Sequence, residues 1–399
     1  MNVLLIHPVP PETPHISSVR MWRFGCELSR LGLHLVLLTR TVQPPDVADV
    51  VSAPSEHDWS QPMVVRAKDT APRASGTVLG RKFGTASQMI ASGGAMAGWV
   101  QSGLREALAL QSSGFRPDVL LATFGSMESL VLARRLGQEM NVPWVADLKD
   151  NWRLYAPFGL RHLMARRTDG WSAVTVNGGV TAACARRFQR TEPTLVYSGV
   201  DDCYLEAQPA PPGHAPGQFT INLVGGLYFE EPLRELMTGI ERWASSRISA
   251  APAVHVNYFG SDSERFDAMA PRYLHKVSHF SHGYLDKEQL AAHCQWGACN
   301  AYVSHWGTFH HKLLELMACG GPILVCPSER AESRGLAEAV SGKIFEAEDA
   351  AQVTSGLATI ADNWRAGANP SINEACRKFS WAGQTRILEK VLSDVIAAT

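Results

Sequence analysis

The chain has 399 residues, of which 45% are hydrophobic and 19% are charged. This apolar content excludes a wholly disordered chain. Because the length exceeds the ~250–300 residues at which one hydrophobic core stops growing, we expect two domains. The formal net charge of −1 argues against a general nucleic-acid-binding protein. The two halves of the chain nevertheless differ in charge. Residues 1–200 contain 21 Lys and Arg against 15 Asp and Glu, whereas residues 201–399 contain 16 Lys and Arg against 23 Asp and Glu.

The sequence predicts a cytoplasmic protein. The apolar run within residues 1–8 is too short for a signal peptide and follows no basic stretch. No run of 18 apolar residues is present to cross a bilayer. The eight cysteines form no C-x-x-C pair and several lie in apolar runs, which indicates buried free thiols in a reducing compartment.

In the first half of the chain, short apolar runs alternate with helical patterns. The runs that we predict to be strands are 2–6, 33–39, 63–67, 118–122, 144–148 and 173–177. Amphipathic stretches at 17–31 and 126–140 predict helices between them. Apolar strands that alternate with helices indicate a parallel sheet covered on both faces.

The clearest boundary is the Pro-, Gly- and Ala-rich stretch 206–217, which has no periodicity. The alternation then restarts, with predicted strands at 219–224, 254–259, 276–280, 300–304 and 322–326 and helices at 230–244, 287–293 and 311–319. We therefore predict an N-terminal Rossmann-like domain (1–205), a linker (206–217), a second domain (218–380) and a terminal helix (381–399) that packs back on the first domain.

Several familiar catalytic motifs are absent. No G-x-G-x-x-G follows the first strand, and neither a P-loop nor a G-x-S-x-G elbow occurs, which disfavours dehydrogenase, P-loop and serine-hydrolase chemistry. By spacing, His275, His279 and His282 are the best metal candidates, but they fall on a predicted strand and turn where they would not converge. No D-x-D is present either. We predict no metal site and no cofactor.

The most informative stretch runs from 304 to 325, where a strand ends, a loop follows and a helix opens near His310. A helix start offers unpaired N–H groups to a phosphate, and Lys312 adds a cation there. Glu315 lies three residues further on nearly the same face, where one carboxylate can accept both hydroxyls of a ribose. A purely structural Lys–Glu pair is the alternative.

This stretch resembles the K-L-x-E-x-M-A-x-G-x-P-[IV] signature of retaining GT-B glycosyltransferases of family 4. Four further segments and the terminal helix resemble family motifs and occur in the family's order: 144–152 (D-x-[RK]-D-x-W), 196–201 (N-G-V-D), 223–227 (G-x-L), 282–285 (G-x-[VL]) and the helix that begins with 379–381. The resemblance thus spans nearly the whole chain.

The resemblance implies the GT-B fold, in which two doubly wound, Rossmann-like parallel-sheet domains face each other across a cleft and a C-terminal helix crosses back to the first domain. It implies a metal-independent retaining glycosyltransferase of the hexosyltransferase type, with a nucleotide-sugar donor as co-substrate. The acceptor would be a hydroxyl of a glycan, a lipid-linked or a small natural-product molecule. The alternatives are a nucleotide-sugar epimerase or hydrolase of the same fold, or a non-catalytic nucleotide-sugar-binding relative.

The resemblance and the strand-end positions select the site residues. For donor binding we predict Gly225, Gly226, Gly283, Tyr284, Thr308, Phe309, His310, His311, Leu313 and Glu315. The predicted catalytic residues are Lys149, Asp150 and Lys312. The alternative for Lys149 is a surface pair with Asp147 or Asp150, worth less than ~1 kcal/mol. On the acceptor side we predict His15 and Arg20, in and after a stiff Pro-rich loop.

The chain also departs from the family. Gly226 and Glu231 stand where the family carries an Arg and a Lys that touch the leaving diphosphate, and Gly307 replaces a Glu that contacts the donor sugar. Lys312 or Arg234 could supply the missing charge, and Gly225 with Gly226 could let backbone N–H groups approach a phosphate. Reduced or lost activity is the alternative.

The charge polarity adds an expectation about the acceptor. A basic first domain favours an acceptor that is anionic, or one that lies on an anionic membrane. The basic and apolar segment 153–167 could contact such a membrane at its inner face, or could be an ordinary amphipathic helix that covers the sheet. The sequence leaves the oligomeric state open.

Overall fold

The computed structural model describes residues 1–13, 15–41, 54–69, 96–149, 172–175, 178, 182, 192–215, 217–247, 252–304, 310–329, 331–364 and 372–399. The chain forms two compact units: the first unit comprises Met1–Gly199 with Trp381–Thr399, and the second unit comprises Val200–Ser380. Asp150, Thr308, Phe309, Gly307 and the basic segment 153–167 lie outside the described residues.

The first unit contains a seven-stranded sheet in which every pairing is parallel. Its strands, in spatial order, are β3 (Met63–Ala67), β2 (His34–Arg40), β1 (Asn2–Ile6), β4 (Val119–Thr123), β5 (Trp144–Leu148), β6 (Ser172–Thr175) and β7 (Thr194–Leu195). Its helices are α1 (Ile16–Arg30), α3 (Ala97–Ser112), α4 (Met127–Met140) and α14 (Trp381–Ala397), with a 3-10 turn at Pro54–Glu56.

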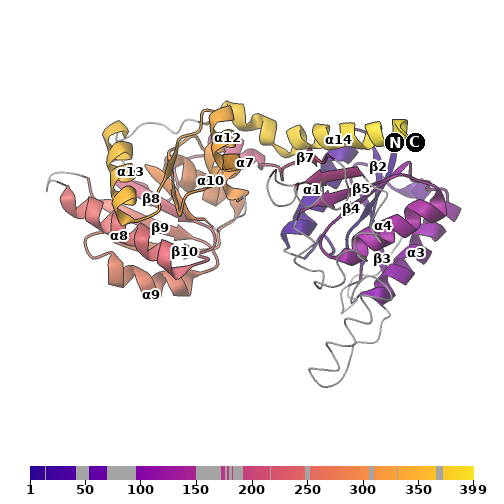
Figure 1. Cartoon of the computed structure of the whole chain (residues 1–399), viewed down its shortest axis with the longest axis horizontal. Coiled ribbons are helices and arrows are strands. Elements are labelled where there is room, and N and C mark those ends of the chain that lie inside the picture. Colours follow the sequence, from indigo (N-terminus) through magenta and orange to yellow (C-terminus); the bar gives the residue numbers. More distant parts are fainter. Residues whose placement is uncertain are drawn as a thin grey trace, which may run out of the picture. The chain divides into compact units, whose positions relative to one another are not determined.

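Both faces of this sheet are buried, as the apolar strands predict. Leu4 and Ile6 of β1 pack into a core with α3 and α4, and the alternate residues Val3 and Leu5 pack into a core with α1 and α14. Figure 1 shows α3 and α4 side by side on one side of the sheet and α14 on the other. The predicted parallel sheet with helices on both faces is therefore present.

The terminal helix α14 is held on the first unit by close packing. The rings of Phe24 and Trp381 meet edge to face, with centroids 5.2 Å apart. A Cβ at Gly199 would come within 2.3 Å of the Trp381 Cα, so only glycine fits there. The predicted helix at the end of the chain thus packs on the first unit.

The second unit contains a six-stranded sheet, also parallel throughout. Its strands, in spatial order, are β10 (Ser278–Gly283), β9 (Val254–Phe259), β8 (Phe219–Val224), β11 (Cys299–Val303), β12 (Ile323–Cys326) and β13 (Ile344–Glu346). Its helices are α7 (Asp202–Leu205), α8 (Glu230–Ser246), α9 (Ser263–Tyr273), α10 (Lys287–Trp296), α11 (Lys312–Ala318), α12 (Ala331–Ala339) and α13 (Ala350–Asn363), with a 3-10 helix at Glu374–Phe379. Residues of α8, α9 and α13 form one core with this sheet.

The Pro-rich stretch predicted as the linker lies within the second unit. The chain leaves the first unit at Gly199 and returns to it at Trp381. Residues 206–215, which we call the strap, run along α10, where the backbone N–H of Gln208 donates to Gln295 Oε1 at 2.8 Å and the indole N–H of Trp296 donates to the Gln208 carbonyl at 2.9 Å. These bonds to α10 explain why a segment without periodicity belongs to the second unit.

The sequence also predicts that no segment crosses a membrane and that the cysteines are free thiols. Among the helices that the structure describes, none combines the length and apolar character needed to cross a membrane. The seven cysteines in the described part of the chain are free, and five of them are buried.

Candidate functional site

The carboxyl end of β8 leads into a glycine turn that is held from several sides. Gly225 adopts the left-handed backbone conformation, with φ of +91°, which an L-residue rarely adopts. Its N–H donates to the Phe259 carbonyl at 2.7 Å, and its carbonyl accepts from the Tyr258 hydroxyl at 3.0 Å. The N–H of Leu227 donates to Asp262 Oδ2 at 2.7 Å. The turn is therefore fixed before any ligand arrives.

Lys312 places its ammonium against this turn. Its Nζ donates to the Val224 carbonyl at 3.2 Å and lies 5.6 Å from the ring centroids of both Tyr228 and Tyr302. A Cβ at position 225 would come within 2.0 Å of Nζ, so glycine is needed for this approach. Burial lowers the pKa of Lys312 to about 8, although Glu315 and other nearby carboxylates oppose the shift. The ammonium is thus largely charged at neutral pH.

A buried carboxylate anchors the other side of this cluster. Glu329 accepts hydrogen bonds from the Tyr302 hydroxyl at 2.7 Å and the Ser333 hydroxyl at 3.1 Å, and its Oε1 lies 3.1 Å from His310 Nδ1. Burial alone would raise the pKa of Glu329, but the hydrogen bonds from His310, Tyr302 and Ser333 outweigh it and leave the pKa below its usual range. An ionised Glu329 therefore orients the His310 ring.

The donor helix predicted at 311–319 is present as α11, which comprises seven residues. His311 occupies its N-cap position. His311 Nε2 lies 3.6 Å from Glu315 Oε1 on the same side of the helix. Leu313 cannot serve as a donor contact as predicted, because its side chain is fully buried and its N–H already donates to the His310 carbonyl at 3.0 Å.

Exposed aromatic rings follow two strands of this sheet, β8 and β10, which lie on either side of β9. Tyr228, after β8, is 47% exposed, and Tyr284, after β10, is 84% exposed. Gly283, the last residue of β10, has φ of +71° and accepts a hydrogen bond from the Gly260 N–H at 2.9 Å. Rings of this kind at strand ends offer flat surfaces on which a planar ligand can stack.

At the positions where this chain departs from the family motif, the nearest cation, Arg234, is already paired with carboxylates. Glu231 lies at the start of α8, 3.8 Å from the Arg234 guanidinium, and Arg234 also pairs with Glu235 at 3.2 Å. At Gly226, a Cβ would meet the Tyr228 ring at 3.2 Å. Since Arg234 is engaged by carboxylates, Lys312 is the better candidate for binding an anion at the glycine turn.

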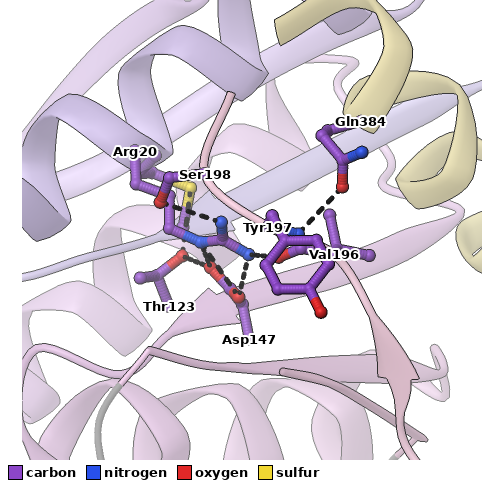
Figure 2. A network of polar contacts seen from close by, with 8 residues as sticks. Arg20, Thr123, Asp147, Val196, Tyr197, Ser198 and Gln384 are labelled. Atoms are coloured by element: carbon purple, nitrogen blue, oxygen red, sulfur yellow. Dashed lines mark hydrogen bonds and ion pairs between the residues drawn. The ribbon is translucent and has the colours of Figure 1, made fainter. Parts of the chain in front are cut away.

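In the first unit, Arg20 forms a buried ion pair with Asp147 at the end of β5 (Figure 2). Its Nε and Nη2 donate to both carboxylate oxygens at 2.8–3.2 Å, Nη1 donates to the Ser198 hydroxyl at 3.2 Å, and Nη2 donates to the Val196 carbonyl at 2.7 Å. Thr123 donates a further hydrogen bond to Asp147 at 2.8 Å. The predicted acceptor-side role of Arg20 is corrected here, because a guanidinium that is 0% exposed and bonded in this way cannot reach an acceptor.

Three residues beside this pair form a polar chain that reaches the surface. Buried His7 lies with Nδ1 3.3 Å from the Thr123 carbonyl and Nε2 3.1 Å from the Ser17 hydroxyl. Ser17 Oγ contacts Nδ1 of His15, whose ring is exposed and caps α1. Burial lowers the pKa of His7 to about 4, and the positive charges of His15 and Lys149 act in the same direction. The His15 ring is exposed to solvent. Lys149, which follows β5 and is partly buried, lies close enough to His7 to lower its pKa.

Sequence reasoning missed Glu329, Tyr302 and Tyr228. The rule that ligands bind at the carboxyl ends of parallel strands could have found two of them, since Glu329 follows β12 and Tyr228 follows β8. No group of three or more His, Cys, Asp or Glu among the described residues could hold a metal ion.

Comparison with known proteins bears on the fold. No family model matches the sequence, and no curated protein matches it. Among solved structures, sucrose-phosphate synthase from Thermosynechococcus elongatus is similar over 100% of both chains, with 14% identity and a TM-score of 0.64. Anabaena HepE, in complex with UDP and glucose, is similar over 99% of this chain and 100% of its own, with 12% identity and a TM-score of 0.62.

The α,α-trehalose-phosphate synthase (UDP-forming) from Burkholderia vietnamiensis is similar over 98% of this chain and 99% of its own, with 13% identity and a TM-score of 0.63. Together with the two parallel sheets described above, these likenesses show that the chain has the GT-B fold. The predicted fold class is confirmed.

Proposed function

We propose that the chain is a metal-independent, retaining glycosyltransferase of the hexosyltransferase type, with a nucleotide sugar as donor. The observation that carries the proposal is the Lys312 ammonium held against the Gly225 turn at the end of β8. A cation beside a turn without a side chain suits a diphosphate, which can approach the backbone closely. The HepE complex with UDP and glucose, on the same fold, supports this class of donor.

The donor would lie along the strand ends of the second unit. Lys312 pairs with the diphosphate, Glu315 accepts hydrogen bonds from the ribose hydroxyls, and Tyr284 with Gly283 borders the nucleobase. His310, held by Glu329, and His311 contact the phosphates or the sugar. Thr308 and Phe309 remain proposed donor contacts from the sequence.

The proposed reaction keeps the configuration of the sugar. The bond from the anomeric carbon to the diphosphate breaks, and the leaving nucleoside diphosphate gains negative charge that Lys312 stabilises. The acceptor hydroxyl attacks on the same face of the sugar and forms the new glycosidic bond, while its proton passes to the leaving phosphate oxygen. No step needs a metal ion or a cofactor.

The acceptor would be held by the first unit. Exposed His15 and partly buried Lys149 are the described candidates, and Asp150 is proposed to orient the acceptor hydroxyl. The excess of Lys and Arg over Asp and Glu in residues 1–200 supports an anionic acceptor, or one on the anionic inner face of a membrane that a cytoplasmic enzyme reaches from its periphery. Such an acceptor makes the rate fall as ionic strength rises.

The proposal is tested by incubating the full chain, in the presence of a chelator, with nucleotide sugars and with sugar, lipid-linked and small-molecule acceptors. UDP-sugars come first, because HepE was solved with UDP. We expect nucleoside diphosphate release only with an acceptor, and a product with the donor's anomeric configuration by NMR. Release or epimerisation without an acceptor would favour a hydrolase or an epimerase instead, and an inverted product would exclude the retaining mechanism.

Binding of the nucleotide tests the site itself. The Glu315→Ala variant should lose nucleotide binding in calorimetry, whereas Glu338→Ala, which removes an exposed carboxylate from α12 in the same unit, should retain it. Equal affinity in wild type and Glu315→Ala would contradict the assignment of the donor site.

A further inference from the structure

The second unit contains a cavity of about 220 Å³ between the sheet, the end of α10 and the strap. Its floor consists of alternate residues on three neighbouring strands: Thr220 and Asn222 of β8, His255 and Asn257 of β9, and Phe280 and His282 of β10. The intervening residues, such as Ile221 and Val256, point into the core on the other face. The floor is therefore the polar face of the sheet.

This cavity is separate from the proposed donor site. The donor residues Gly225 and Lys312 lie at or beyond the carboxyl ends of the strands, whereas the floor residues precede those ends. None of the donor residues proposed above lines the cavity among the described residues. Whatever binds here does not do so as part of the diphosphate site.

The walls of the cavity are held in place. The Trp296 indole donates to the strap at Gln208, and the Trp296 ring lies with its centroid 5.1 Å from that of His214. On the other side, the ring of His282 lies 5.3 Å from His293 and 4.6 Å from Phe280. The strap thus closes one side of a preformed space.

One buried acceptor in the floor has no described partner. The Asn222 side chain is 1% exposed, and its amide Nδ2 donates to the His293 carbonyl at 2.6 Å and to Asn300 Oδ1 at 3.3 Å. These two bonds fix which end of the amide is which. Oδ1 is left without a hydrogen-bond partner among the described residues. Because Oδ1 is enclosed by the protein, it helps to fix the floor, and contacts to a ligand fall to the partly exposed floor residues Asn257 and His255.

The lining also selects the charge and shape of a ligand. It contains no Lys, Arg, Asp or Glu, so an ion would be buried without a counter-charge. Amides and imidazoles supply hydrogen-bond donors and acceptors, and Phe280, 61% exposed, supplies an open ring face with Trp296. The volume lies below the ~300–1,000 Å³ of pockets for drug-sized ligands, which favours a single ring.

We propose that this cavity is a second binding site, for one uncharged monosaccharide, and that the partly exposed side chains of Asn257 and His255 form hydrogen bonds with sugar hydroxyls there. The aromatic faces of Phe280 and Trp296 contact the apolar face of the sugar ring. The site does not depend on the proposed transferase activity, because it shares no residue with the donor site.

The test is calorimetric titration of the full chain with neutral monosaccharides, such as glucose, galactose, mannose and N-acetylglucosamine, and with the anionic glucose 6-phosphate. We expect saturable binding of at least one neutral sugar, with the phosphate bound at least about tenfold more weakly. Saturating UDP should leave this binding unchanged, because the two sites are separate.

Variants of residues on the strands that form the floor test whether the sugar binds in this cavity. Phe280→Ala and His255→Ala should each weaken it by about tenfold, whereas His279→Ala, on β10 but facing the other side of the sheet near Phe266, should not change it. Because Phe280 is largely exposed, its loss should leave the fold intact, which a melting curve checks. The proposal is overturned if no neutral sugar binds, if UDP displaces the sugar, or if Phe280→Ala and His255→Ala bind it as wild type does.

Discussion

The two units place polar side chains at the same position in similar sheets, yet they use them differently. In the first unit, Arg20 of α1 and Asp147 near the end of β5 are buried and bonded on all sides (Figure 2). In the second unit, Lys312 lies against the Gly225 turn beside a half-exposed Tyr228. The first cluster is closed within its unit, and the second contains the cation that we propose binds a diphosphate.

The chemistry of the two cations explains the contrast. The guanidinium of Arg20 binds the carboxylate of Asp147 through two nitrogens and has further donors for Ser198 and Val196, so its charge is compensated within the protein. Lys312 donates a hydrogen bond to the neutral Val224 carbonyl, and burial lowers its pKa although nearby carboxylates such as Glu315 oppose the shift. Lys312 therefore gains more than Arg20 when an anion binds its ammonium directly.

The largest effect should come from breaking the buried ion pair of Arg20 and Asp147. We expect Arg20→Ala to lower the free energy of unfolding by about 3–5 kcal/mol, because it leaves the Asp147 carboxylate buried without its partner. Arg30→Ala, which removes an exposed Arg from the ion pair with Glu27 on the same helix, should cost less than ~1 kcal/mol. Denaturant unfolding measures both. A stable Arg20→Ala protein with a raised KM for the acceptor would restore the contact role that the structure rejects.

The second-largest effect concerns the loss of stability when His7 is protonated at acidic pH. Its pKa in the folded chain is about 4, below the usual 6.5, so the folded state keeps the ring neutral where the unfolded chain protonates it. This contribution to stability is complete above about pH 6.5 and is lost as the pH falls towards 4, a change of about 3 kcal/mol.

Thermal unfolding at several pH values should show this loss in wild type and a shallower pH dependence in His7→Gln. His34→Gln, which changes an exposed histidine of the first unit, is the control. Identical pH dependence in wild type and His7→Gln would mean that His7 is not the group that is protonated.

A smaller effect tests whether the charge of Lys312 contributes to nucleotide binding. Since the pKa of Lys312 is about 8, its charge is lost as the pH rises through that value, and nucleoside diphosphate binding should weaken by up to about tenfold between pH 7 and 9. Lys312→Arg should bind without this pH dependence, because Arg stays charged. Lys312→Ala should bind about ten- to hundredfold more weakly at all these pH values. A pH-dependent loss that persists in Lys312→Arg would assign it to another group.

Much of the fold could be predicted from the sequence because it follows from apolar patterning. The strands at 2–6, 63–67 and 144–148 appear with the predicted limits, and those at 2–6 and 144–148 are buried on both faces. The short strands β7 and β13 were missed, since Thr194–Leu195 and Ile344–Glu346 lack an apolar run. Edge strands of this kind are defined by pairing with a neighbour, which a local pattern does not encode.

The site was harder to predict because it depends on contacts between distant segments. The helix start and the family resemblance pointed to Lys312 and Gly225. They could not show that Arg20 would be enclosed by Asp147 and Ser198, which lie 127 and 178 residues away. The place of the Pro-rich stretch in the second unit was hidden for the same reason, since composition does not reveal that Trp296 binds the strap. Patterning indicates which residues are buried, and long-range partners decide what each polar group does.

The smallest effect separates backbone strain from the position of the cation. Gly225 and Gly217 have similar positive φ values, +91° and +97°, so alanine at either should cost about 1–2 kcal/mol in the free energy of unfolding. A Cβ at 217 meets nothing within 4 Å, whereas one at 225 would come within 2.0 Å of Lys312 Nζ. Gly225→Ala should therefore also weaken nucleotide binding, by displacing the ammonium, and Gly217→Ala should not. If both variants lose the same stability and keep the wild-type affinity, the Gly225 turn serves the fold alone and Lys312 binds no diphosphate there.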